Sequence, residues 1–103
     1  MELYKRISQE KAKEMMDTIK DCIILDVRTK DEFEIGHIKG AVNFPNEDID
    51  EDFSAIEDLD ACILIYCRSG HRSLNASAKL GLIGYKNIYE FGGINTWKYE
   101  IVK

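Results

Sequence analysis

Apolar residues change their spacing several times along this 103-residue chain, and each spacing predicts a different element. Behind Ser8, a residue type suited to the N-cap, they recur at helical intervals and predict a first helix over 8–20. The run 22–27 is then almost continuously apolar, which is typical of a strand buried on both faces. Thr29 and Glu32 fit a capping box, so a short helix is expected to begin there.

The second half of the chain continues the alternation. Strands are predicted at 41–44, 61–66 and 87–91, a helix at 73–82 and a terminal helical turn at 94–99. Because alternating strands and helices favour parallel pairing, we expect an α/β fold with a small central parallel sheet and helices on both faces. The length suits one hydrophobic core, so residues 1–103 are expected to form a single domain.

The segment from Glu47 to Asp60 is rich in acidic residues and contains no basic one. Phe53, Ile56 and Leu59 recur within it at helical spacing, which predicts a short solvated helix with a thin apolar face. A docking surface for a basic partner is the alternative interpretation.

Net charge and hydropathy limit the function. The net charge is −5 and the sequence pI is about 5.0, which argues against nucleic acid or an anionic membrane as a partner, because both bind basic surfaces. No apolar stretch approaches the roughly 20 residues of a membrane helix. The N-terminus lacks the apolar core of a signal peptide. We therefore expect a cytoplasmic protein with neither a nucleic-acid nor a membrane partner.

The chain has three cysteines, Cys22, Cys62 and Cys67, and no CxxC pair, so the sequence suggests neither a disulfide framework nor a zinc site. Cys22 and Cys62 lie inside apolar runs and are interpreted as small buried hydrophobes. No metal and no cofactor is expected, and a reducing compartment fits this pattern.

Cys67 differs because it stands where a predicted strand ends and a turn begins. The segment 67–73 reads Cys-Arg-Ser-Gly-His-Arg-Ser. Backbone N–H groups of such a turn, together with the positive end of the following helix, stabilise an anionic sulfur. Arg68 and Arg72 add two positive charges that would lower the pKa of the thiol. A cationic loop in an acidic protein suits a small anionic substrate.

The same loop resembles the active-site loop of the rhodanese family. Residues 25–28, 32–33 and 36–45 are similar to the family's N-terminal signature, and 84–85, 92–93 and Trp97 resemble its C-terminal one. The resemblance covers nearly the whole chain. It implies a rhodanese-like fold and an enzyme of the thiosulfate sulfurtransferase class, in which Cys67 is the catalytic residue and carries sulfur as a persulfide.

In that reaction the Cys67 thiolate would attack the outer sulfur of an anionic donor such as thiosulfate. Cyanide, a small thiol or a protein thiol would then accept the sulfur. Backbone N–H groups would stabilise the terminal sulfur, and the two guanidinium groups would hold the oxyanion end of the donor. The predicted substrate-binding residues are Arg68, Ser69, Gly70, His71 and Arg72.

Two alternatives stay open. Phosphatases and arsenate reductases that resemble rhodanese carry Cys-x5-Arg, whereas four residues separate Cys67 from Arg72. A loop one residue smaller suits a single sulfur better than a tetrahedral oxyanion, so sulfur transfer is favoured. The second alternative is a non-enzymatic sulfur-relay or persulfide-sensing module that passes sulfur only within a protein complex.

Other polar residues are assigned supporting roles. Asp26 and Arg28 lie at the carboxyl end of a predicted strand and are expected to brace adjacent loops. The resemblance implies that Asp26 lies near the pocket, so it is kept as a secondary candidate. Ser73 is expected to cap the helix after the loop. His37 is expected to make a structural hydrogen bond, while His71 either tunes the thiolate or faces solvent.

Overall fold

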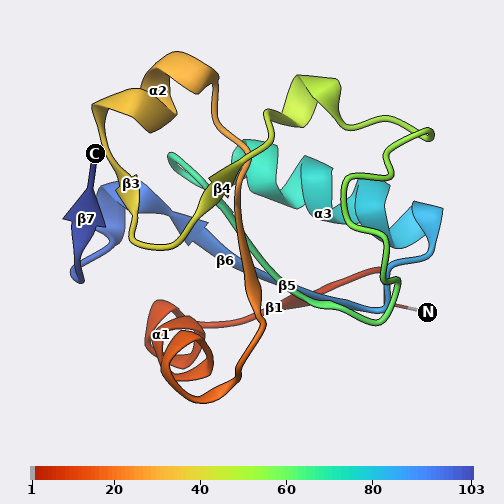
Figure 1. The fold of residues 1–103 in the computed structure, drawn as a ribbon, viewed down its shortest axis with the longest axis horizontal. Coiled ribbons are helices and arrows are strands. Elements are labelled where there is room, and N and C mark those ends of the chain that lie inside the picture. Colours follow the sequence, from red (N-terminus) through yellow and green to blue (C-terminus); the bar gives the residue numbers. More distant parts are fainter. Residues whose placement is uncertain (1) are drawn as a thin grey trace.

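A parallel sheet of five strands lies at the centre of the structure, a computed structural model that describes residues 2–103 (Figure 1). The strand order is β1-β6-β5-β2-β4, and every neighbouring pair is parallel. These strands are β1 Lys5–Arg6, β2 Ile23–Asp26, β4 Val42–Asn43, β5 Cys62–Cys67 and β6 Asn87–Gly93. A separate antiparallel pair joins β3 His37–Ile38 to β7 Ile101–Val102. The predicted α/β fold with a central parallel sheet is confirmed.

Helices cover both faces of the sheet, as predicted. They are α1 Gln9–Thr18, α2 Lys30–Ile35 and α3 His71–Ile83, with 3-10 turns at Asn46–Asp48 and Ile94–Thr96. Figure 1 shows α1 and α3 on opposite sides of β5 and β6. The Ser8 hydroxyl accepts a hydrogen bond from the Lys11 N–H, and Thr29 and Glu32 form the predicted capping box. None of the helices within residues 2–103 has the length and apolarity needed to cross a membrane.

Strand β5 divides the core, because successive side chains of a strand point to opposite faces. Ile63, Ile65 and Cys67 point toward α3 and join one buried cluster. Leu64 and Tyr66 point toward α1 and join the other. The strand therefore carries Cys67 to the α3 face at the carboxyl end of the sheet, the edge at which parallel sheets bind ligands.

The prediction of a helix in the acidic segment was wrong, because residues 49–60 form turns and bends instead. Ile49 and Phe53 are buried, whereas Leu59 is 44% exposed. The carboxylates of Asp50 and Asp58 each accept a hydrogen bond from the backbone N–H two residues later. Such local bonds stabilise turns at the expense of a helix. The apolar spacing in this segment therefore reflects burial of individual turn residues.

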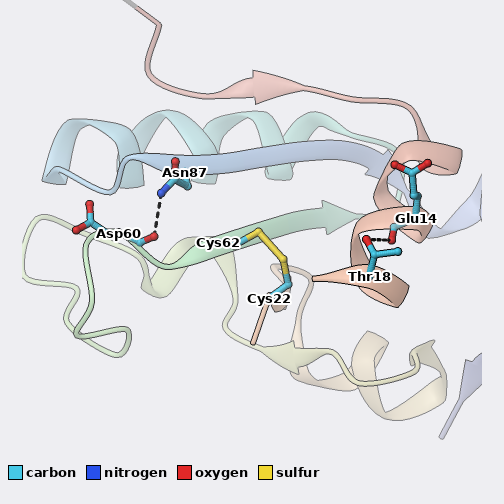
Figure 2. Close-up of a disulfide and its surroundings, with 6 residues drawn as sticks. All are labelled: Glu14, Thr18, Cys22, Asp60, Cys62 and Asn87. Carbon is cyan, nitrogen blue, oxygen red and sulfur yellow. Dashed lines mark hydrogen bonds between the residues drawn. A yellow bond between two sulfur atoms is a disulfide. The ribbon is translucent and has the colours of Figure 1, made fainter. Parts of the chain in front are cut away.

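Cys22 and Cys62 form a disulfide, which corrects the prediction that both are unpaired small hydrophobes (Figure 2). They stand immediately before Ile23 and Ile63, which pair in the register of β2 and β5. The two cysteines thus lie opposite each other, with Cα atoms 4.9 Å apart. They are 40 residues apart in sequence, so only the strand register brings them together.

Candidate active site

Cys67 is the last residue of β5 and the one cysteine of the chain outside the disulfide. Its side chain is buried. The Gly70 N–H donates to Sγ at 3.0 Å, and the Ser73 Oγ lies 3.4 Å from Sγ. The structure therefore places the sulfur at a strand end beside the start of α3, as the sequence predicts.

Hydrogen bonds to Sγ favour the thiolate. Burial alone raises the pKa of Cys67, because it removes a charged sulfur from water. Hydrogen bonds that Sγ can accept from the hydroxyl and N–H of Ser73 and from the N–H groups of Gly70 and Ser69 lower it by more, so the pKa lies below its ordinary value. We expected the loop N–H groups, the start of the helix and two arginines to cause this lowering. The loop N–H groups do contribute, Ser73 contributes with them, and Arg72 interacts with the sulfur through its charge.

The loop after Cys67 packs directly against the end of β6. The pairing of β5 with β6 shifts next to Cys67, which marks a bulge beside the sulfur. Gly93 lies so close to the loop that a Cβ there would overlap the carbonyl of Arg68, and the Asn95 N–H donates to that carbonyl at 3.2 Å. Gly70 has a φ of +110°, in the left-handed region that favours glycine. These contacts define the path of the backbone whose N–H groups reach Sγ.

Ser73 does not cap α3, contrary to the prediction. The helix begins at His71, with Gly70 as its N-cap and no side-chain cap bond, so Ser73 lies inside the first turn. Its Oγ lies 2.6 Å from Glu90 Oε2 and 3.0 Å from the Gly70 carbonyl oxygen. The earlier start of the helix thus turns the Ser73 hydroxyl toward Cys67.

The two arginines of the loop occupy different environments. Arg72 donates to both carboxylate oxygens of Glu32 on α2, at 2.6 and 3.0 Å. This pairing raises the pKa of Arg72 and lowers the pKa of Glu32 to about 2. Arg68 is exposed. The two guanidinium groups therefore do not flank the sulfur as an equivalent pair.

Asp26 and Arg28 form a buried ion pair at 2.7 Å. Arg28 Nη2 also donates to the carbonyl of Gly36 at 2.7 Å, which ties β2 to the end of α2 and confirms the predicted bracing role. The Tyr66 hydroxyl donates to Asp26 Oδ2 at 2.5 Å. Burial and this bond raise the pKa of Tyr66 well above its ordinary value. Because Tyr66 and Cys67 are successive residues of β5, this network lies across the sheet from Sγ.

The strand-end thiol, its loop and the parallel sheet agree with a family match. A profile of the rhodanese-like domain matches residues 8–100. The chain belongs to this family. The fold that the sequence resemblance implied is thereby confirmed.

Named relatives of this rhodanese-family chain include two bacterial proteins called thiosulfate sulfurtransferase GlpE. The protein from Ectopseudomonas mendocina is 32% identical over 99 residues, and that from Pseudomonas putida is 34% identical over 99 residues. In both comparisons the match covers 95% of this chain and 88% of the relative.

Solved structures of the rhodanese family are similar as well. A rhodanese with anions from E. coli is 28% identical, with a TM-score of 0.72, over 80% of this chain and 98% of that one. A rhodanese-like domain protein from Staphylococcus aureus is 27% identical, with a TM-score of 0.81, over 93% of each chain.

The two histidines of this rhodanese-family chain lie in unlike places. The His37 ring stacks on Phe33 with centroids 3.8 Å apart, and its Nδ1 lies 3.0 Å from the Phe33 carbonyl oxygen. The structural role predicted for His37 is therefore confirmed. His71 is exposed at the first position of α3, which agrees with the solvent-facing alternative.

Sequence reasoning missed Glu90, a buried carboxylate beside the candidate site of this rhodanese domain. Glu90 is in phase with Ile88 on β6, at a position whose side chain faces α3. An apolar residue is the usual occupant of such a position. A charged residue at an inward position of a predicted strand was the signal that could have identified it.

Proposed function

We propose that this chain is a sulfurtransferase that carries sulfur as a persulfide on Cys67. The observation that supports it best is a buried thiol at the end of β5 that accepts a hydrogen bond from the Gly70 N–H at 3.0 Å. Hydrogen bonding from the adjoining loop also lowers the pKa of this thiol. The relatives named thiosulfate sulfurtransferase support thiosulfate as the donor class.

In the first step the Cys67 thiolate attacks the outer sulfur of thiosulfate. The electron pair of Sγ forms the new S–S bond, while the S–S bond of the donor breaks and its pair leaves with sulfite. In the second step cyanide or a thiolate attacks the outer sulfur of the persulfide, and Cys67 leaves as a thiolate. The total charge is unchanged in each step.

The backbone and the side chains of the loop have different roles in this reaction. Backbone N–H groups such as that of Gly70 stabilise the anionic sulfur. Arg68, exposed at the start of the loop, binds the oxyanion end of the donor through charge-assisted hydrogen bonds. Arg72 holds the loop in place through its ion pair with Glu32 and contributes charge from one side.

Peptide mass spectrometry after incubation with thiosulfate tests this function. The native protein should gain the mass of one sulfur atom on the Cys67 peptide, and cyanide should remove it. Cys67→Ser is the control, because its hydroxyl fills nearly the same volume but forms no persulfide. The double variant Cys22→Ser/Cys62→Ser should still gain the sulfur.

The outcomes separate the candidate functions. Absence of the mass gain would overturn the proposed function. A gain on Cys67 without turnover of free thiosulfate and cyanide would instead indicate a sulfur-relay module. Hydrolysis of an aryl phosphate as fast as sulfur transfer would indicate a phosphatase.

A further inference from the structure

Glu90 is a buried carboxylate that the reaction above does not use. It pairs with Ile65 in the register of β5 and β6, so its side chain lies on the α3 side of the sheet. It is 1% exposed. Oε1 accepts a hydrogen bond from Arg6 Nε at 3.3 Å, and Oε2 accepts one from the Gly92 N–H at 3.0 Å. Burial of a charge is costly, so a carboxylate here calls for a physical role.

Ser73 connects Glu90 to the sulfur. Its Oγ lies 2.6 Å from Glu90 Oε2 and 3.4 Å from Cys67 Sγ. A hydroxyl has a single proton to donate. While that proton is directed to the Glu90 carboxylate, Ser73 can only accept a hydrogen bond from the Cys67 thiol. When Glu90 itself is protonated and donates to Ser73, the hydroxyl is free to donate to a Cys67 thiolate.

The two ends of this network cannot both be anionic at low cost. The two distances to Oγ limit the separation of Sγ and Glu90 Oε2 to about 6 Å. Two negative charges that close inside a protein repel, as they do in carboxylate pairs that share one proton. One negative charge shared by Cys67 and Glu90 therefore costs less than two.

Neighbouring groups stabilise the charge at both ends. Sγ receives the loop N–H bonds at the start of α3, whereas Glu90 has Arg6 of β1, whose side chain is 67% exposed. The other charged groups around the network are Arg72 of α3 with Glu32 of α2, and the pair Asp26–Arg28 at the end of β2. Each end of the network therefore has groups that stabilise a negative charge.

We propose that Cys67, Ser73 and Glu90 form a proton relay that converts the Cys67 thiol to a thiolate without releasing a proton to solvent. The thiol proton moves from Sγ to Ser73 Oγ as the hydroxyl proton moves from Oγ to Glu90 Oε2. The electron pair stays on Sγ, and the negative charge passes from Glu90 to Cys67. When sulfur transfer returns Cys67 as a thiolate, the reverse shift restores the carboxylate.

Coupling of this kind changes how reactivity depends on pH. Two interacting groups titrate in two macroscopic steps, and between them the fraction of thiolate stays constant. The relay rests on the proposed function only in that sulfur transfer would use the thiolate that it forms. The same proton transfer would precede alkylation of Cys67 by a reagent.

The rate of Cys67 alkylation by iodoacetamide as a function of pH tests the relay. The native protein should show two inflections, with a rate that varies by less than about threefold between them. Glu90→Gln keeps the side-chain shape but accepts no proton, so its profile should have one inflection. Two pH units below that inflection the variant should react about 100-fold more slowly than on its plateau.

Two further variants complete the comparison. Ser73→Ala removes the bridging hydroxyl with Glu90 in place. It should lower the alkylation rate between the two inflections, because that hydroxyl no longer donates to the thiolate. Glu57→Gln, an exposed residue of the acidic segment, is the matched control and should keep the native profile. A single inflection in the native protein, or two in Glu90→Gln, would overturn the relay.

Infrared spectroscopy supplies a second readout that does not require the Glu90 variant to remain folded. At a pH between the two inflections the native protein should show a protonated-carboxyl band that Cys67→Ser lacks, because a serine hydroxyl does not give up its proton there. Equal bands in the two proteins would contradict the relay. A missing persulfide with an intact two-step profile would refute the sulfurtransferase function and leave the relay standing.

Discussion

Arg68 lies in the loop after β5 and Arg72 in the first turn of α3, and of the two only Arg72 is paired with a carboxylate within residues 2–103. Arg68→Ala should therefore act mainly on donor affinity. Loss of one charged hydrogen-bonding group is worth about 1.5–3 kcal/mol, or roughly ten- to a hundredfold in kcat/KM for thiosulfate. Arg72→Ala should also slow persulfide formation, because the loop loses its anchor to Glu32. Steady-state kinetics with thiosulfate and cyanide measure both effects.

Lys86→Ala removes an exposed cation next to Asn87, which pairs with Cys62 at the end of β5 opposite Cys67, and serves as the control. Its kinetics should match those of the native protein. Unchanged thiosulfate kinetics in Arg68→Ala would show that this guanidinium does not bind the donor.

The ion pair of Glu32 with Arg72 also makes stability depend on pH. Hydrogen bonding to Arg72 lowers the pKa of Glu32 from its ordinary value of 4.5 to about 2. The stabilisation is complete above pH 4.5 and is lost as the pH falls toward 2, because the unfolded state then binds a proton that the folded state resists. Urea midpoints should fall across this window in the native protein.

In Glu32→Gln the urea midpoint should fall less between pH 4.5 and 2, because the glutamine amide does not take up a proton in this range. Glu34→Gln changes an exposed carboxylate on the same helix and should show the native fall. Identical declines in the two variants would mean that the pair contributes nothing to acid stability.

At the scale of elements, β6 approaches the Cys67 loop so closely that Gly93 has no room for a side chain. A Cβ at Gly93 would overlap the carbonyl of Arg68, which is backbone and cannot rotate away. Gly93→Ala should cost about 1–3 kcal/mol of unfolding free energy and displace the loop, which slows Cys67 alkylation. Gly40→Ala is the control, because it adds only left-handed strain at φ +87° without a clash. Chemical denaturation measures the change in unfolding free energy, and the rate of Cys67 alkylation reports the displacement of the loop.

The same elements show what the sequence can predict. Helix α1, helix α2 and the central strands were predictable because their caps and apolar runs are local signals. The start of α3 was misplaced because Gly70 ends the loop without a side-chain cap, so Ser73 was read as the cap. In the acidic segment, aspartate side chains bond to nearby N–H groups and override the helical spacing.

The candidate site divides in the same way. Cys67 and its loop are contiguous in sequence, so their chemistry was readable from residue types alone. Glu90 joins the site through the pairing of β6 with β5, and the disulfide depends on the pairing of β2 with β5. Such contacts depend on strand register, which no local pattern specifies.

At the scale of the whole molecule, the disulfide closes a loop of 40 residues between β2 and β5. Cross-links of this kind typically stabilise a domain by about 2–4 kcal/mol, mainly by restricting the unfolded chain. Reduction by dithiothreitol should therefore lower the Tm by about 10 °C or more. Differential scanning calorimetry with and without reductant measures the change.

The double variant Cys22→Ser/Cys62→Ser should have the Tm of the reduced protein, and the reductant should not change that Tm. Peptide mapping should find Cys67 equally reactive in every case. A Tm that does not respond to reductant would show that the cross-link adds no stability.

Strand β5 also acts as a spacer between two kinds of sulfur. Cys62 and Cys67 stand at opposite ends of it, about 16 Å apart at the usual rise of a strand, and they point to opposite faces. A thiolate must touch a disulfide sulfur to exchange with it. The disulfide therefore cannot exchange with a sulfur atom bound to Cys67 of the same molecule. A sulfur atom bound there can be transferred only to a second molecule that binds at the loop.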